Sequence, residues 1–324
     1  DPVTGSIGYA YDAAGRCVEV TSAAQTVACD YDPLGRLIAV RSGRDLATLA
    51  YDDVGRVESV TLPNGLTRLY DYDDAGRITR LAYAATAGGE EVASFAVDYD
   101  ATGRCRRATS SDGLVGEFTY DGIGMLARET WHSANGLIQD DRYEYDAGGN
   151  RVRLERLDET LVYHLDSTSD RLLAVTSSRS GETQFDYDGF GALVAIRHPD
   201  GSREALTYDL ERRLASWSRT GGTAPPLALE WDCDAWGNRV AERATPAQGA
   251  VRERLFRLDT ASTAVPQRFD ECSPDGTRAV GHIRGPEGLL WSQGPGIADR
   301  QTYLADPFQN IRSVLDADGN EIDR

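Results

Sequence analysis

The sequence predicts an all-β protein built from antiparallel β-hairpins, and three observations predict it. A six-residue element, Tyr-Asp-x-x-Gly-Arg, recurs along the chain. Apolar and polar residues alternate before its tyrosines, as in Phe118-Thr119-Tyr120 and Phe185-Asp186-Tyr187. Asn-Gly and Asp-Gly dipeptides, which favour hairpin turns, lie between copies of the element. Alternation with a period of two indicates strands with one covered face, so we expect a long meander with very little helix.

The repeat accounts for most of the tyrosine in the chain. The Tyr-Asp element has nine copies, not counting the overlapping pair Tyr70-Asp71; they use nine of the 15 tyrosines, and in eight copies a glycine follows four residues after the tyrosine. The ninth copy begins at Tyr208. The residues that we assign to the structural motif are Tyr11, Asp12, Gly15, Arg16, Tyr31, Asp32, Gly35, Arg36, Tyr51, Asp52, Gly55, Arg56, Tyr72, Asp73, Gly76, Arg77, Tyr99, Asp100, Gly103, Arg104, Tyr120, Asp121, Gly124, Tyr145, Asp146, Gly149, Tyr187, Asp188 and Gly191.

The stereochemistry of a turn explains the element without a catalytic or ligand-binding role. A type I turn favours Asp at its first position and Gly at its fourth. The glycine adopts the left-handed conformation and forms the bulge that lets a short loop close a hairpin. The Asp carboxylate accepts hydrogen bonds from backbone N–H groups of the turn. An arginine that follows the glycine stacks on tyrosine rings and pairs with aspartate.

A second class of turn separates the Tyr-Asp turns. Its dipeptides are typical of two-residue hairpin loops. They are Asn64-Gly65, Asp112-Gly113, Asn135-Gly136, Asp200-Gly201, Asp275-Gly276 and Asp318-Gly319. Turns therefore alternate about every ten residues, which leaves strands of five to seven residues.

A meander of this length is not expected to remain flat. Strands twist, and sheets of more than about ten strands curl, split or close. We therefore predict a sheet that spirals around an interior as a hollow shell, incomplete at both ends, with residues 1–240 as the repeat shell and residues 241–324 as degenerate repeats of the same body. Open sheet edges at Asp1 and Arg324 predict association of the isolated chain. Because the first residue is Asp, we expect a piece excised from a longer protein.

Charge excludes two classes of partner. The 324 residues carry 52 acidic and 34 basic side chains, a net charge of −18, and all the basic residues are arginine. Nucleic-acid binding needs a basic stripe to neutralise phosphates, and an anionic membrane would repel the chain. No apolar run approaches the ~20 residues of a membrane helix, so we expect no membrane insertion by this segment.

Residues that suggest metal or catalytic chemistry lack the necessary spacing. Asp316-Ala317-Asp318-Gly319-Asn320 suggests calcium, but an EF-hand needs a Glu at position twelve, and a turn explains the same residues. The histidines show no zinc spacing; they are His132, His164, His198 and His282. A carboxylate that recurs at one offset in each copy fits turn capping better than acid–base catalysis. We therefore predict no catalytic residue, cofactor or metal.

Cysteine and tryptophan leave two alternatives open. The five cysteines include no CxxC motif and fit the core as small apolar residues, although Cys17 and Cys29 flank a turn and could face each other. The tryptophans fit either strand packing or a sugar-stacking platform. They are Trp131, Trp217, Trp231, Trp236 and Trp291.

The motif resembles the YD repeats of the RHS (rearrangement hot spot) family. The copies that carry the resemblance begin at Tyr11 (YDAAGR), Tyr31 (YDPLGR), Tyr51 (YDDVGR), Tyr72 (YDDAGR) and Tyr99 (YDATGR). Degenerate copies follow Tyr163 and Trp231. The segment that begins with HIRGPEGLLW and continues with TYLADPFQNIRSVLDADGNEID resembles the last repeats before the RHS-associated core.

The resemblance implies a spiral β-shell and a function in carrying cargo. In bacterial polymorphic toxins and in toxin-complex components with a hypervariable C-terminus, the shell encloses a toxic domain. An aspartate-based self-cleavage motif that begins DPxG releases this cargo, but here Phe308 and Gln309 follow Asp306-Pro307, so the motif is absent and no enzyme activity is expected. The implied partners are the remaining parts of the parent shell, an enclosed toxin domain and a secretion apparatus. The implied setting is bacterial and interbacterial competition, with assembly in the cytoplasm before export or surface delivery.

Three other functions remain open at this stage. The first is an adhesin-like module that binds glycans or cell-surface receptors, because the similar barrels of animal teneurins serve adhesion. The second is a wall-associated protein without cargo. The third is an enzyme with its site in a shell loop, for which the sequence offers no candidate residues.

Overall fold

The protein consists of antiparallel β-strands joined by short turns, as the computed structural model shows. The structure describes residues 6–323 except 24, 261–266, 276, 287, 295–298 and 318–319. It contains 29 strands, and the described residues include no α-helix. No helix in this part of the chain is long and apolar enough to cross a membrane. The prediction of an all-β antiparallel meander is confirmed.

The chain divides into two compact units, and each strand pairs antiparallel with its sequence neighbours inside its unit. Unit 1 comprises Asp1–Val97, Ser110–Asp112 and Arg254–Arg324, and unit 2 comprises Asp98–Thr109 and Gly113–Glu253. The first run of strands is β1 (Gly8–Tyr11), β2 (Cys17–Thr21), β3 (Thr26–Tyr31), β4 (Leu37–Ser42), β5 (Asp45–Tyr51), β6 (Val57–Thr61), β7 (Leu66–Tyr72), β8 (Ile78–Ala85) and β9 (Glu91–Tyr99).

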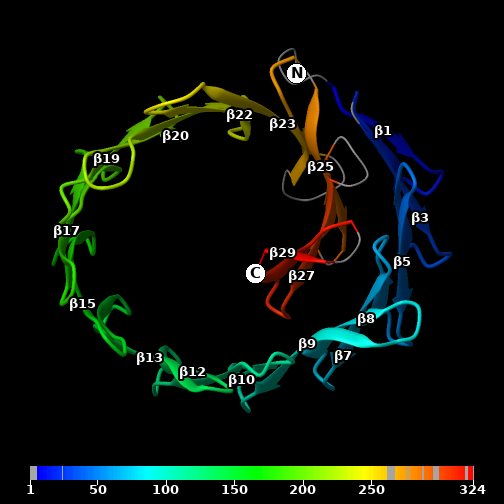
Figure 1. The fold of residues 1–324 in the computed structure, drawn as a ribbon, viewed down its shortest axis with the longest axis horizontal. Coiled ribbons are helices and arrows are strands. Elements are labelled where there is room, and N and C mark those ends of the chain that lie inside the picture. The colour runs from blue at the N-terminus through cyan, green and yellow to red at the C-terminus, as the bar shows by residue number, and fades with distance from the viewer. Residues whose placement is uncertain are drawn as a thin grey trace. The chain divides into compact units, whose positions relative to one another are not determined.

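Unit 2 continues the meander. Its strands are β10 (Cys105–Ser110), β11 (Val115–Tyr120), β12 (Leu126–Ser133), β13 (Gly136–Tyr145), β14 (Arg151–Glu155), β15 (Thr160–Leu165), β16 (Leu172–Ser177), β17 (Gly181–Tyr187), β18 (Leu193–Arg197), β19 (Arg203–Tyr208), β20 (Leu214–Thr220), β21 (Leu227–Cys233) and β22 (Arg239–Pro246). Figure 1 shows these strands, coloured green to yellow, as a single curved layer.

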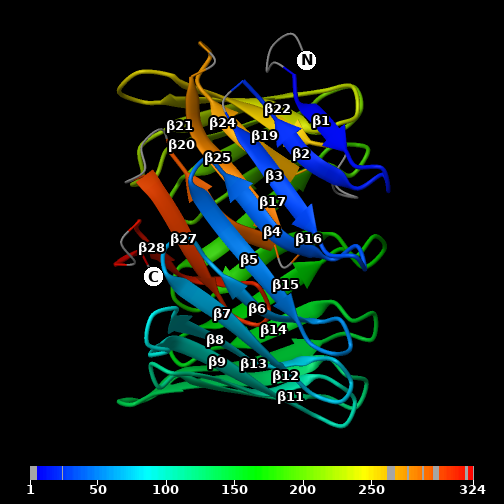
Figure 2. The same cartoon turned by 90° about the vertical axis from the view of Figure 1, so that its right-hand side faces the viewer.

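The last strands return to unit 1. They are β23 (Arg252–Asp259), β24 (Gln267–Cys272), β25 (Arg278–Gly285), β26 (Gly288–Gln293), β27 (Arg300–Ala305), β28 (Ile311–Leu315) and β29 (Glu321–Asp323). Strand β25 contacts β4, and Figures 1 and 2 show β25 and β27 (orange to red) alongside β3 to β8 (blue). Unit 1 is therefore two layers thick, whereas unit 2 is one.

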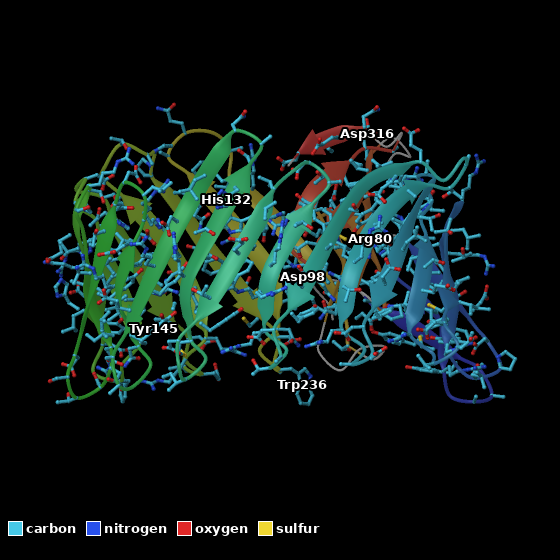
Figure 3. All side chains as sticks on the ribbon, turned by 90° about the horizontal axis from the view of Figure 1, so that it is seen from below. Arg80, Asp98, His132, Tyr145, Trp236 and Asp316 are labelled. Carbon is cyan, nitrogen blue, oxygen red and sulfur yellow. The ribbon has the colours of Figure 1, made fainter. Side chains whose placement is uncertain are left out.

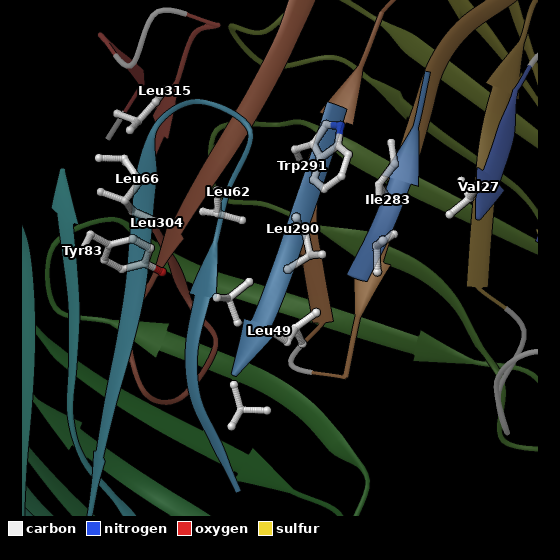
Figure 4. Close-up of a cluster of buried hydrophobic side chains, with 14 of the residues drawn as sticks. Val27, Leu49, Leu62, Leu66, Tyr83, Ile283, Leu290, Trp291, Leu304 and Leu315 are labelled. Atoms are coloured by element: carbon white, nitrogen blue, oxygen red, sulfur yellow. The ribbon is translucent and has the colours of Figure 1, made fainter. Parts of the chain in front are cut away.

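The hydrophobic core lies between the two layers of unit 1. Val40, Val60 and Tyr83 of the first layer and Ile283 and Trp291 of the second are fully buried. Figure 4 shows side chains from both layers meeting in this cluster. Full burial of one such side chain contributes about 1.5–3 kcal/mol, so the second layer stabilises unit 1 in a way that unit 2 lacks.

The glycine dipeptides form a different turn from the one predicted. At Asn64-Gly65 and Asp200-Gly201 the glycine N–H donates to the carbonyl three residues earlier, at 3.2 and 3.1 Å, with φ of +82° for both glycines. Each is thus a four-residue turn with glycine in fourth position, and the prediction of two-residue loops there is wrong. A left-handed glycine in fourth position closes a type I turn with a bulge, which matches strand twist as well as the two-residue loop does.

Two-residue loops do occur elsewhere in the described residues. Ala134 and Asn135 form a two-residue loop between the paired Ser133 and Gly136, so the glycine lies outside it. An unpredicted two-residue loop, Gly43-Arg44, joins the paired Ser42 and Asp45. Asp318-Gly319 and Gly276 lie outside the described residues.

Candidate functional site

The Tyr-Asp turns form a ladder in which each turn is tied to the next. In the copy that begins at Tyr51, the Asp52 Oδ1 accepts hydrogen bonds from the backbone N–H groups of Val54 (3.1 Å) and Arg56 (2.8 Å). The Arg56 Nε donates to the Asp52 Oδ2 at 2.7 Å. The Gly55 N–H donates to the Asp52 carbonyl at 3.0 Å, and Gly55 has φ of +87°. The aspartate therefore organises the whole turn.

The arginine also reaches the next copy. The Arg56 guanidinium lies 4.5 Å from the centre of the Tyr72 ring, and its Nη1 donates to the Asp73 carbonyl at 3.3 Å. The Tyr72 hydroxyl donates back to the Val57 carbonyl at 2.8 Å. One arginine thus fixes its own turn and stacks on the tyrosine of the following one, which combines an ion pair with a cation–π contact.

The same contacts recur along the chain. The tyrosine hydroxyl of one copy donates to a backbone carbonyl, that of the residue directly after the previous copy. The tyrosines that do so are Tyr31, Tyr51, Tyr72, Tyr120, Tyr145, Tyr187 and Tyr208. Arginines stack on the next tyrosine in the pairs Arg16–Tyr31, Arg36–Tyr51, Arg56–Tyr72, Arg104–Tyr120 and Arg171–Tyr187. Tyr11, in the first copy, is 52% exposed.

The remaining motif residues occupy the same places in their turns. Asp12, Asp32, Asp73, Asp100, Asp121, Asp146 and Asp188 cap backbone N–H groups of their own turns. The glycines are left-handed at Gly15, Gly35, Gly76, Gly103, Gly124, Gly149 and Gly191. Tyr99 ends β9, and Arg77 pairs with Asp73 at 2.6 Å. These turns lie at one end of the strands. Figure 3 shows Tyr145 and Trp236 toward that end of the strands in unit 2 and His132 toward the opposite end.

Three degenerate turns replace the glycine, and sequence reasoning did not assign their conformation. Asp170, Arg212 and Gln309 have φ of +54°, +65° and +64°, and they are the only described non-glycine residues with positive φ. Each stands where other copies have glycine. Asparagine also replaces arginine: the Asn238 Nδ2 donates to the Asp234 Oδ2 at 2.9 Å. The signal was present as Asp-x-x-Gly-Asn, which preserves the capping aspartate.

Hydrogen bonding keeps the turn carboxylates ionised. The pKa of Asp73 lies below its usual value, chiefly because the Arg77 side chain donates to it and then because backbone N–H groups do. The Thr168 hydroxyl, with backbone donors, lowers the pKa of Asp166 to about 2. These shifts follow from capping and do not indicate a proton-transfer site.

The two layers of unit 1 are joined by polar contacts as well as by the core. The Ser22 hydroxyl donates to the Asp270 Oδ2 at 2.7 Å, and Asp270, which is fully buried, pairs with Arg257 at 3.0 Å. The Tyr83 hydroxyl donates to the Ala305 carbonyl at 3.1 Å and accepts from the Ala305 N–H at 2.8 Å. Burial raises the pKa of Tyr83, which holds it as a neutral hydrogen-bonding group.

A row of polar side chains crosses strands β24 to β27. The His282 Nδ1 lies 3.0 Å from the Ser292 hydroxyl, which accepts from the Tyr303 hydroxyl at 3.0 Å, and the His282 Nε2 lies 3.5 Å from the Glu271 Oε1. The adjacent His282 imidazole, together with the charges of Arg254 and Arg268, lowers the pKa of Glu271 to about 2. Since Ser292 is only 2% exposed, the row ties the four strands together and gives no substrate access to the serine.

The other candidate residues are dispersed. His164 contacts Thr176, His198 contacts Glu204, and the described residues contain no group of three potential metal ligands. All five cysteines are free, including Cys17 and Cys29. Asp316 caps its turn by accepting from the Asn320 N–H at 2.8 Å.

The five tryptophans do not form a single platform. Trp291 is fully buried and Trp236 is 89% exposed. Trp131 packs edge-on against Phe118. The indole N–H groups of Trp217 and Trp231 donate to Glu204 and Glu242 at 2.6 and 3.0 Å.

The register defines two chemically different faces in unit 2. The face that carries the motif tyrosines, here called the tyrosine face, is rich in half-buried aromatic and aliphatic side chains. It contains Phe118, Trp131, Tyr143, Leu154, Leu161, Tyr163, Val175, Phe185, Ile196, Leu206, Trp217, Leu229 and Trp231. The opposite face carries cross-strand ion pairs such as Arg128–Asp140, Arg197–Asp186 and Arg243–Glu230.

The same face has different surroundings in unit 1. There Val40, Val60 and Tyr83 lie on the tyrosine face and are buried under the second layer. In unit 2 the main contacts of each described strand are with its sequence neighbours, so no second layer of the unit covers the face. An apolar face without a covering layer is the most distinctive surface of unit 2.

Family models match both parts of the chain. Residues 4–133 match the Teneurin YD-shell model, and residues 167–203 match the RHS Repeat model. These matches confirm the resemblance to RHS/YD repeats that the sequence motif indicates. The chain is a shell-type repeat module, which is a structural role, and no curated protein matches it.

Solved structures share the fold of this RHS/YD-repeat module. The crystal structure of TcdB2-TccC3-Cdc42 matches with a TM-score of 0.59 and 14% identity, covering 97% of this chain and 20% of that one. The crystal structure of TcdB2-TccC3 matches with a TM-score of 0.56 and 13% identity, covering 99% and 24%. The module thus spans about a fifth of the length of the chains that it matches.

Proposed function

We propose that the chain is a non-catalytic wall segment of an RHS-type toxin shell that encloses and carries a toxic C-terminal polypeptide. The observation that carries this proposal is the tyrosine face of unit 2. Large side chains such as Phe185, Leu206 and Trp217 remain half-buried there, although the equivalent face of unit 1 is covered. Contiguous exposed apolar surface is typical of a binding surface.

The chemistry of the face fits an unfolded polypeptide. Carboxylates lie among the aromatic rings, including Glu129, which accepts from Tyr143 at 2.8 Å, and Glu204, which accepts from Trp217. Apolar surface binds exposed apolar side chains, and carboxylates attract basic ones. With a net charge of −18, the chain as a whole favours basic cargo by diffuse attraction.

The proposal includes partners and a location. The shell would be completed by other segments of the parent protein, loaded in the bacterial cytoplasm, and exported or delivered at the cell surface by a secretion apparatus. The solved relatives contain TcdB2 together with TccC3, which supports a shell built jointly with other chains.

Site-specific photocrosslinking in the full-length parent protein tests the proposal. A benzoylphenylalanine at Phe185 lies on the tyrosine face, and one at Asp186 lies on the opposite face of the same strand. We expect cross-links from position 185 to the toxic C-terminal region and none from position 186. Equal cross-linking from both positions, or none from either, would refute encapsulation and favour an adhesion or wall module.

A further inference from the structure

Three successive turns of unit 2 present large apolar side chains to solvent. Phe190, Leu210 and Trp236 are 80%, 99% and 89% exposed. They lie at the tips of the turns that join β17 to β18, β19 to β20 and β21 to β22. Neighbouring tips are therefore two strands apart, about 10 Å. We call these three residues the apolar tip row. Such a row costs solubility, and exposed patches of this kind mark interaction sites.

Arg212 makes the middle turn unusual. It occupies the glycine position in the left-handed conformation, which costs a non-glycine residue roughly 1–2 kcal/mol. Its guanidinium lies 4.4 Å from the centre of the Phe190 ring, and its charge helps to lower the pKa of Asp188. Strained residues gather where function holds them. Here the strained residue places a cation against Phe190 in the tip row.

The composition of the tip row is that of a binding hot spot. Tryptophan, phenylalanine and arginine are enriched at the centres of protein interfaces. Among the other tips of unit 2, Ile123 is large and apolar, but the tips on either side of it carry Thr102 and Gly148, so a run of three such tips occurs only in this row of the unit.

The row is also complementary to itself. Its order is aromatic, aliphatic, aromatic, with Leu210 in the centre. A two-fold rotation through Leu210 sets Phe190 of one copy against Trp236 of the other. Self-complementarity of this kind is what a symmetric dimer requires.

We propose that the apolar tip row is a self-association surface through which two copies of this chain pair, with the turns of one copy packed against the turns of the other. At about 150–250 Å² for each large side chain, the row buries roughly 1,000 Å² in a dimer, which is at the lower limit for a specific interface. The dimer is therefore weak. Because each copy carries −18, repulsion opposes pairing, and salt that screens charge beyond about 8 Å strengthens it.

Sedimentation equilibrium of the chain tests this inference. We expect a reversible dimer between about 10 and 300 µM that becomes tighter when NaCl is raised from about 0.15 to 0.5 M. Trp236→Ser is expected to weaken it about tenfold or more. Arg212→Gly is expected to weaken it severalfold while raising thermal stability, because the strain disappears with the contact. Circular dichroism checks that both variants are folded.

Matched tips elsewhere serve as controls. Ile123 is 82% exposed at a turn whose neighbouring tips carry Thr102 and Gly148, so Ile123→Ser is expected to leave the dimer unchanged. Leu34, which is 79% exposed, lies in unit 1 outside the tip row, so Leu34→Ser is expected to leave the dimer unchanged as well. A chain that remains monomeric at both salt concentrations would overturn the proposal. Association that Trp236→Ser does not weaken would also overturn it, because pairing of open strand edges would then be the cause.

Discussion

Replacing Tyr83 with phenylalanine removes one oxygen atom that joins the two layers of unit 1. This oxygen donates to the Ala305 carbonyl at 3.1 Å and accepts from the Ala305 N–H at 2.8 Å. Tyr83 is fully buried, and phenylalanine fits the same space. The variant therefore tests hydrogen bonding between the layers without opening a cavity in the core.

The structure gives the size of the effect. A buried donor left without a partner costs about 1–3 kcal/mol, and loss of the second hydrogen bond adds about 0.5–1.5 kcal/mol. Tyr83→Phe is therefore expected to lower the free energy of unfolding of unit 1 by about 2–4 kcal/mol. Tyr51→Phe loses the hydrogen bond to the Leu37 carbonyl in a half-buried ladder position, so we expect a cost of about 0.5–1.5 kcal/mol.

Urea unfolding and hydrogen exchange measure this difference. Trp291 is fully buried in the second layer, so tryptophan fluorescence reports its detachment. Exchange of backbone amides in β27 (Arg300–Ala305) is expected to accelerate in Tyr83→Phe and to remain unchanged in Tyr51→Phe. Equal destabilisation by the two variants, or unchanged exchange in β27, would refute the reasoning that this oxygen holds the layers together.

Three further variants test other steps of the argument. Gln309→Gly removes a left-handed non-glycine residue and is expected to stabilise unit 1 by up to ~1 kcal/mol in urea unfolding; a loss of stability would contradict it. The pKa of Glu271 is lowered to about 2, so its ionised carboxylate contributes to the free energy of unfolding above about pH 4.5, and this contribution is lost as pH falls through 2. Glu271→Gln is accordingly expected to be less stable than the parent at pH 7, with the gap closing in acid; a gap that is constant with pH would exclude this linkage. Gly116→Ala places a Cβ 2.9 Å from the Trp131 ring and is expected to cost about 1–3 kcal/mol, whereas unchanged thermal unfolding would show that the ring moves aside.

Local pattern was sufficient to predict the hairpins and their chemistry. The Asp12 carboxylate, the Gly15 bulge and the Arg16 pair follow from turn stereochemistry within six residues, so one copy predicts the rest. The prediction failed for loop type at Asn64-Gly65. Glycine permits the left-handed conformation in either loop, and the register of the flanking strands, which the dipeptide does not encode, selects between them.

The covering of the tyrosine face could not be predicted in the same way. Val40 of unit 1 and Val175 of unit 2 lie on the same face of similar strands, yet the first is buried and the second is half-exposed. The difference comes from β24 to β28, more than 200 residues after Val40. Alternation reports that a face is apolar, but not what covers it, because the covering layer is a long-range contact with no local signal.

This ambiguity is also why the candidate binding surface lies in unit 2. The tyrosine face is apolar in both units. In unit 1 the second layer covers it, held by the core and by the hydrogen bonds of Ser22 and Tyr83. At about 25 cal/mol per Å² of apolar area, an exposed face of large side chains is unfavourable for a protein that works alone. A cover from another polypeptide removes this cost, and an enclosed cargo chain is the cover that we propose.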